Sequence, residues 1–279
     1  MTGSFLDTVF ACPMCRGYLD CREADLVCGQ CGESYPQAHP GIWDLMPPGA
    51  GTDDWQRRQA ECDQWYRELF GDPELARACY KQDLTPLASE LASLRGVVLD
   101  IGGGNGVTRA YLPADAHYLV VEPSRAWAAW DRSVVGGPVS TATGESHFVR
   151  GIGEQLPIRD GTVDAAIALW SMNHVTDPER VVAEIARVTR PGGAGLLVFE
   201  DVEPGWADLV WHRPWRGGAR AGRAAMMIKF RTALGGKWPL QSDHLRIEER
   251  LLRNWLAPAF LIEKRSWITS YLVLRLKRK

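Results

Sequence analysis

Short apolar runs alternate with amphipathic segments of helical periodicity along most of the chain. Runs typical of strands buried on both faces occupy residues 97–101, 118–122, 163–170 and 195–201. Helical spacing of apolar residues occupies 53–70, 73–95, 178–189 and 244–256, and a further helix is expected to begin near Val107. The runs FLIEKRSWI and YLVLRLKRK predict a C-terminal antiparallel hairpin. This alternation predicts an α/β fold with a parallel sheet and a ligand at the carboxyl ends of its strands.

The N-terminal segment is predicted to fold around a metal ion. Two CxxC pairs, twelve residues apart, have the spacing of a tetrahedral zinc site with the ligands Cys12, Cys15, Cys28 and Cys31. Between them, YLDCREADLV reads as two short strands around a polar turn, and Cys21 is placed in a strand rather than on the metal. Four thiolates leave no open coordination position, so the zinc is expected to be structural. A pair of disulfides is the alternative, but MTGSFLDTVF lacks the pattern of a signal peptide.

A glycine-rich turn follows the strand at 97–101. Asp100, Gly102, Gly104 and Gly106 alternate with other residues, whereas the dinucleotide motif GxGxxG would need a glycine where Val107 stands. An acidic residue and alternating glycines suit a ligand with a cationic amino-acid part and no pyrophosphate. The next strand ends in Glu122, whose carboxylate could accept hydrogen bonds from both ribose hydroxyls of a nucleoside.

Two further blocks complete a family pattern. GIGEQLPIRDG at 151–161 leads into the strand at 163–170, and RVTRPGGAGLLVFED ends the core at residue 201, with a turn expected at 190–193. Together the blocks of residues 97–201 resemble the class I S-adenosylmethionine-dependent methyltransferases, in the type 11 group with the motif GxxExLPxxDGxxD. The cysteine segment resembles the zinc ribbon that precedes some of these enzymes, including guanine-specific rRNA methyltransferases. The resemblance implies a seven-stranded Rossmann-like sheet with helices on both faces.

The resemblance also assigns residues to the cofactor S-adenosyl-L-methionine. Asp100 and the turn of Gly102, Gly103, Gly104 and Gly106 would hold its methionine part, and Glu122 its ribose. The adenine would be lined by Ile152, Gly153 and Glu154, although the family often has Asp where Ile152 stands. Trp170, at the end of the fourth strand, is expected to join this cofactor-binding set.

Catalytic residues are harder to choose, because methyl transfer needs orientation more than a general base. His174 follows the fourth strand and is the candidate base, with packing or helix capping as the alternative. Glu145 and His147, assigned to a loop, and Asp201 and Glu203, just past the fifth strand, are further candidates.

Charge is distributed unevenly along the chain. Residues 1–200 carry 16 basic and 27 acidic side chains, whereas residues 201–279 carry 16 basic and 7 acidic ones. Part of this excess lies in the insertion 204–240, which contains four tryptophans and in which 219–234 reads as a basic amphipathic helix. The insertion could form a lid over a small substrate, an RNA-binding surface or a helix on a membrane surface. Alternatively, its apolar side chains could belong to the core and its basic residues could pair with acidic residues elsewhere.

These observations predict a ribbon and linker at 1–50 and a methyltransferase domain at 51–279. The expected acceptor is a small molecule, such as an aromatic, lipidic or anionic secondary metabolite. The alternative is a base of rRNA or tRNA, which the acidic ribbon disfavours, since residues 1–50 hold two basic and six acidic residues. A scaffold protein and a cofactor-dependent enzyme that transfers no methyl group also remain open. No apolar run of 18 residues suggests a transmembrane helix, and a cytoplasmic location is expected.

Overall fold

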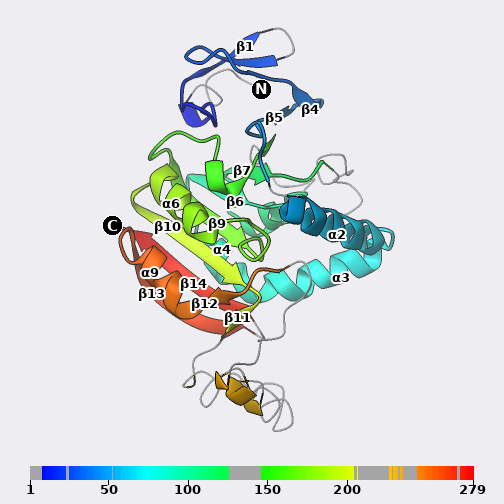
Figure 1. Cartoon of the computed structure of the whole chain (residues 1–279), viewed down its shortest axis with the longest axis vertical. Coiled ribbons are helices and arrows are strands. Elements are labelled where there is room, and N and C mark those ends of the chain that lie inside the picture. Colours follow the sequence, from blue (N-terminus) through cyan, green and yellow to red (C-terminus); the bar gives the residue numbers. More distant parts are fainter. Residues whose placement is uncertain are drawn as a thin grey trace.

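A nine-stranded sheet forms the centre of the computed structural model (Figure 1). The structure describes residues 8–22, 25–51, 53–125, 146–203, 206, 226–227, 229–231, 233–234, 244–268 and 271–279. The strands, in spatial order, are β13 (Phe260–Ile268), β14 (Tyr271–Arg278), β10 (Thr189–Phe199), β9 (Val163–Leu169), β6 (Val97–Ile101), β7 (His117–Glu122), β8 (Ser146–Arg150), β5 (Ile42–Asp44) and β4 (Gln37–His39). The strands from β10 to β5 pair in parallel, and β14, β13 and β4 are antiparallel to their neighbours.

The first seven strands of this order form the expected Rossmann-like sheet, and β5 and β4 extend its edge. Both extra strands come from residues 37–44, which the sequence assigned to the ribbon segment. Parallel pairing of Trp43 with Val149 joins β5 to β8, and Asp44 forms an ion pair with Arg150 at 2.7 Å. The segment before residue 50 is therefore continuous with the large sheet at this edge.

Helices cover both faces of the sheet. They are α2 (Asp53–Phe70), α3 (Pro73–Leu84), α4 (Ala88–Leu91), α6 (Pro178–Val188) and α9 (Glu249–Leu256), with short 3-10 turns at η1 (Thr85–Leu87), η2 (Val107–Tyr111) and η4 (Gly153–Gln155). Successive residues of a strand point to opposite faces. Leu99 of β6 accordingly packs in the cluster that contains α6 and α9, and Val98 packs in the cluster that contains the end of α3.

Local sequence explains where two of these helices begin. Asp72 precedes α3 and accepts hydrogen bonds from the N–H groups of Glu74 and Leu75, with Pro73 at the first position. Asp177 caps α6 in the same way through the N–H of Arg180, again with proline following. An acidic cap followed by proline satisfies the free N–H groups of the first turn and sets the backbone angle of helix entry.

The N-terminal ribbon is a three-stranded sheet that docks on the main body. Its strands are β1 (Leu19–Arg22), β2 (Asp25–Cys28) and β3 (Ser34–Tyr35), and the first two match the expected strands around a polar turn. The ribbon lies beyond the end of the large sheet near α6 (Figure 1). The Arg16 guanidinium donates two hydrogen bonds to the Glu184 carboxylate on α6, at 2.9 and 3.2 Å.

Several segments differ from the sequence-based expectation. Ser146–Arg150 forms strand β8 inside the sheet, so His147 lies in a strand and is buried, not in a loop. The helix expected near Val107 is a 3-10 turn of five residues. The Pro-Gly-Gly run expected to be a turn lies within β10, where its pairing with β9 shifts register between Thr189 and Ala194. The last helix starts at Glu249, after a short strand β12 (Ile247–Glu248).

Most of the basic insertion lies outside the described residues, including three of its four tryptophans. β11 (Val202–Glu203) pairs in parallel with β12, so the chain leaves and returns at adjacent points. Within the insertion, Met226, Met227, Phe230 and Leu234 are exposed, which contradicts the alternative that they belong to the core. Among the described residues, no helix is long and apolar enough to cross a bilayer.

Candidate functional site

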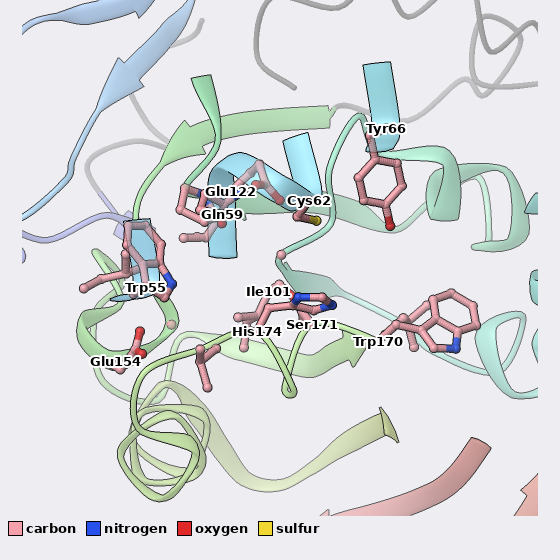
Figure 2. Close-up of a pocket in the computed structure, with 17 residues that line it drawn as sticks. Trp55, Gln59, Cys62, Tyr66, Ile101, Glu122, Glu154, Trp170, Ser171 and His174 are labelled. Atoms are coloured by element: carbon pink, nitrogen blue, oxygen red, sulfur yellow. The ribbon is translucent and has the colours of Figure 1, made fainter. Parts of the chain in front are cut away.

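A cavity opens at the carboxyl ends of β6, β7 and β9, where a parallel sheet is expected to bind its ligand (Figure 2). One wall is a single face of α2, formed by Trp55, Gln59, Cys62 and Tyr66, which recur at spacings of three and four. The sequence did not lead us to predict this wall. The helical spacing of these four residues was the available signal.

Glu122 lies at the end of β7 and lines this cavity. Its carboxylate accepts hydrogen bonds from the N–H of Gly104 at 3.0 Å and of Ser124 at 2.9 Å. Burial raises the pKa of this carboxyl to about 7, despite the two N–H donors that lower it. Each carboxylate oxygen has a second lone pair, so Glu122 retains the capacity to accept hydrogen bonds from a diol.

The glycine turn brings the backbone against the cavity. Gly102 lines it, and Gly102, Gly104 and Gly106 have positive φ values of 68°, 54° and 79°, which favour glycine. A Cβ atom on Gly102 would also lie 2.5 Å from the Cβ of Ser171. The turn therefore requires glycine at this position for both conformation and space.

Asp100 does not line the cavity and lies beneath the turn. The Tyr118 hydroxyl donates a hydrogen bond to its carboxylate at 2.5 Å, and burial raises the pKa of this carboxyl to about 6. A Cβ on Gly103 would lie 2.6 Å from the Asp100 Cγ, so the turn rests directly on the carboxylate. Asp100 thus supports the turn from below, and Gly103, Gly104 and Gly106, which belong to the turn, also lie outside the cavity lining.

The third motif supplies the opposite wall through Ile152, Gly153 and Glu154. Ile152 offers an apolar surface, and a Cβ on Gly153 would lie 3.1 Å from a methyl group of Val181. The Glu154 carboxylate accepts hydrogen bonds from the N–H groups of Thr176 and Asp177, at 2.6 and 3.2 Å. Glu154 therefore ties this wall to the loop that begins α6.

A second cavity of about 520 Å³ adjoins the first. The two share Cys62, Tyr66, Trp170 and His174 in their linings. The second is also lined by residues of α2, α3 and β14, by the residue after β10 and by one residue before β12. They are Glu61, Trp65, Cys79, Tyr80, Gln82, Asp83, Tyr271, Glu200 and His244. Its walls combine aromatic rings with carboxylates and histidines.

Trp170 lines both cavities and therefore stands at their junction. Its φ of 61° is the left-handed conformation, which is unusual for a bulky residue. The indole packs edge-on against Tyr271, with ring centroids 5.7 Å apart. Its buried Nε1 has no hydrogen-bonding partner among the described residues, so this N–H is available to a ligand.

The other candidate side chains divide between the site and the core. His174 lines both cavities, and Asp201 accepts a hydrogen bond from His244 at 2.5 Å. His147 is buried in β8 and lines neither cavity, which removes it from the candidate base residues. Glu203 belongs to β11, and Glu145 lies outside the described residues.

The four ribbon cysteines converge as a metal site requires. Their sulfur atoms all lie within 4.8 Å of one another, with Cys12–Cys31 at 3.7 Å and Cys15–Cys28 at 3.4 Å. Four sulfurs at about 2.3 Å from a tetrahedral zinc are about 3.8 Å apart. The N–H groups of Gly17 and Gln30 point at the sulfurs of Cys15 and Cys28, at 3.4 Å each. These residues fit zinc, and Cys21 is exposed and outside the cluster.

Comparisons with known proteins match the chain to methyltransferases. A family model described as a methyltransferase domain matches residues 99–197. An uncharacterized methyltransferase of Mycobacteroides abscessus is 31% identical over 205 residues, covering 66% of this chain and 72% of that protein. An uncharacterized methyltransferase of Mycobacterium sp. (strain JLS) is 33% identical over 160 residues. This match covers 57% of this chain and 55% of that protein, so it spans about half the length of that relative. A solved SAM-dependent methyltransferase from Aquifex aeolicus is 11% identical, covers 75% of this chain and 99% of that one, and has a TM-score of 0.49.

Proposed function

Because the chain belongs to the methyltransferase family, we propose that it binds S-adenosyl-L-methionine and transfers the methyl group to a small-molecule acceptor. The observation that carries this proposal is the meeting of two cavities at Trp170 and His174. One has the carboxylate and glycine turn that suit a nucleoside with an amino-acid tail. The other is large enough for an acceptor and opens beside it.

The first cavity fits the cofactor in its distribution of polar and apolar groups. Glu122 would accept hydrogen bonds from the ribose hydroxyls, and Ile152 and Gly153 would pack on the adenine. The backbone at Gly102, where a side chain would not fit, would hold the methionine part. When bound, the cofactor supplies a methyl group on a positively charged sulfur. The enclosing residues Trp55, Tyr66 and Trp170 would orient it and exclude water.

The second cavity favours a small acceptor over RNA. Its volume lies within the range of about 300–1,000 Å³ that is usual for small-molecule sites. Its described lining includes the acidic residues Glu61, Asp83 and Glu200 and contains no lysine or arginine, so it would repel a phosphate backbone. The aromatic walls and the free N–H of Trp170 suit a hydroxylated aromatic molecule. His174, which lies between the cavities, is positioned to take a proton from such an acceptor.

The ribbon contributes structure rather than chemistry in this proposal. Cys12, Cys15, Cys28 and Cys31 would bind one zinc ion with all four positions filled by thiolates. Residues 1–50 would thus form a metal-stabilised unit, although β4 and β5 add to the sheet of the domain at 51–279. Metal-dependent folding of the ribbon would keep Arg16 beside Glu184 on α6. A cytoplasmic location completes the proposal, since thiolate sites persist in reducing compartments.

The test uses S-adenosyl-L-methionine with a labelled methyl group, a panel of hydroxylated aromatic compounds and total RNA. We expect label in small molecules, and loss of that transfer in Glu122→Gln. Label incorporated into RNA, with binding that weakens steeply as salt is raised, would instead support the nucleic-acid alternative. Absence of cofactor binding by calorimetry would refute the proposal altogether.

A further inference from the structure

Two histidines and a glutamate converge in the acceptor cavity from three distant parts of the chain. His174 follows β9, Glu200 follows β10, and His244 lies between the insertion 204–240 and β12. The Nε2 atoms of His174 and His244 lie 3.6 and 3.2 Å from the same Glu200 oxygen, Oε2. One ligand atom from each residue lies within 4.8 Å of the other two. We infer that these three side chains bind a divalent transition-metal ion in the acceptor cavity.

The distances between the three candidate ligand atoms agree with those expected around a single shared metal ion. Nitrogen and oxygen ligands about 2.1 Å from a metal are about 3.0–3.4 Å apart when their angles are octahedral or tetrahedral. The two distances to Glu200 are near this range and need only small side-chain movements. The rings of His174 and His244 are nearly perpendicular, with centroids 4.6 Å apart, so both can direct a nitrogen to one point without clashing.

Asp201 fixes the His244 ring in the form that binds metal. An ionised carboxylate can only accept, so the N–H at His244 Nδ1 donates a hydrogen bond to the Asp201 oxygen at 2.5 Å. In the neutral ring, Nε2 then carries a lone pair and faces the Glu200 oxygen, which is also an electron donor. A cation between these two atoms would remove their repulsion. A carboxylate behind a metal-binding histidine is the usual arrangement around such ions.

Asn173 holds all three elements in place. Its buried side chain accepts from the N–H of Glu200 at 3.0 Å and donates to the Leu245 carbonyl at 2.9 Å. Asn173 itself precedes His174, and Leu245 follows His244. Each candidate ligand is therefore fixed by a hydrogen bond at itself or at its immediate neighbour. Such prior ordering lowers the cost of assembling a metal site.

The ligand set indicates which ion would bind. Two imidazoles and a carboxylate suit zinc and the neighbouring transition metals, whereas magnesium prefers oxygen ligands alone. Three protein ligands leave coordination positions open, unlike the four thiolates of the ribbon. His174 and Glu200 line the 520 Å³ cavity, so the open positions face the space proposed for the acceptor.

The role of the ion rests on the proposed function, and in it the ion replaces His174 as the group that activates the acceptor, because a metal-bound His174 Nε2 can no longer accept a proton. A bound metal would hold an acceptor hydroxyl and lower its pKa, so that the proton is released to solvent before transfer. Methylation of that oxygen would then form one carbon–oxygen bond as one carbon–sulfur bond breaks. The acceptor class would accordingly be molecules with adjacent oxygen donors, such as catechols or hydroxy acids.

Metal binding is measured on the full chain with its ribbon already loaded with zinc. Mn²⁺ is the probe, followed by electron paramagnetic resonance, because thiolates disfavour this ion and the nitrogen and oxygen set accepts it. We expect one Mn²⁺ per chain, at least about 100-fold weaker in Glu200→Gln and about 10- to 100-fold weaker in Asp201→Asn. Glu61→Gln, a carboxylate of the same cavity outside the cluster, should bind Mn²⁺ as the wild type does.

Melting curves identify any variant that fails to fold, and His174→Gln provides a second ligand variant that is partly exposed. Failure of the wild type to bind Mn²⁺, Co²⁺ or Zn²⁺ beyond the ribbon equivalent overturns the inference. Unchanged affinity in both Glu200→Gln and His174→Gln overturns it as well. Metal binding is measured here without any activity assay, so the two proposals can fail separately. Mn²⁺ binding in a protein that transfers no methyl group refutes only the proposed function. Methyl transfer in a protein that binds no Mn²⁺ refutes only the metal site.

Discussion

Replacing Glu122 with glutamine tests the proposed cofactor site most directly. The substitution keeps the size of the side chain and removes its charge. In the structure, the carboxylate lines the cavity and accepts two backbone N–H groups, from Gly104 and Ser124. A glutamine can retain one of these acceptor contacts, but its NH₂ group would face the other N–H. The ribose hydroxyls would also lose a charged partner.

The expected loss of cofactor-binding free energy follows from the difference between charged and neutral hydrogen bonds. Charge-assisted bonds contribute about 1.5–3 kcal/mol and neutral ones about 0.5–1.5 kcal/mol. We expect the two ribose contacts together to lose about 1–3 kcal/mol, which weakens binding by roughly 5- to 150-fold. Calorimetric titration with S-adenosyl-L-methionine measures this loss, and Glu263→Gln, a carboxylate on β13 outside both cavities, is the matched control.

The pH dependence gives the same substitution a second signature. Burial raises the pKa of the Glu122 carboxyl from 4.5 to about 7 in the protein without ligand. The folded chain therefore retains this proton between pH 4.5 and 7 when the unfolded chain has lost it, so this group's contribution to stability falls as pH rises through that window. Ribose binding requires the ionised form, so affinity should instead rise with pH, by about tenfold from pH 6 to pH 8.

5′-Methylthioadenosine is the appropriate ligand for this series, because it lacks the titrating amino-acid part. Glu122→Gln should bind it weakly and without the rise between pH 6 and 8. An unchanged affinity in the variant, or an equal pH dependence in variant and wild type, would show that Glu122 does not contact the ribose.

Four further substitutions test other parts of the structure. Cys28→Ser should hold one zinc ion fewer per chain than the wild type and Cys21→Ser the same number, as measured by elemental analysis; an unchanged zinc content in Cys28→Ser would exclude that ligand set. Gly102→Ala should lower the free energy of unfolding by about 1–3 kcal/mol in denaturant titrations, because the backbone there is left-handed and a Cβ would meet Ser171. An unchanged free energy of unfolding would contradict this packing. Glu184→Gln should cost about 1–3 kcal/mol in the same assay, because the N–H donors of Arg16, Leu156 and Arg187 lose their charged acceptor.

The elements that the sequence predicted are those whose pattern is local. The strands at 97–101 and 163–170 are continuous apolar runs, and the turn after Asp100 needs glycines for its own backbone angles. Strand β8 was missed because Ser146, His147 and Arg150 interrupt its apolar character. Its strand conformation depends on pairing with β7 and β5, which are distant in sequence.

The candidate site depends even more on contacts between residues that are distant in sequence. Glu122 could be predicted as a candidate because it is the last residue of a recognisable strand. The His174, Glu200 and His244 cluster could not, because the return of the chain after the insertion brings His244 to the other two. Asp100 was expected to contact the ligand, but the neighbouring strand places the Tyr118 hydroxyl against its carboxylate.

The strained backbone of Trp170 connects the fold to the proposed chemistry. A left-handed conformation at a non-glycine residue costs on the order of 1–3 kcal/mol, and the surrounding structure must enforce it. Here the Trp170 N–H donates to the Val198 carbonyl, and the next residue, Ser171, donates its hydroxyl to the Ile101 carbonyl at 2.6 Å. Both acceptors belong to strands that flank β9, so the sheet itself holds the bend. The bend directs the indole to the boundary of the two cavities, where methyl transfer would require a wall that excludes water and aligns both ligands. Without the bend, β9 would continue along the sheet and the indole would not close this boundary.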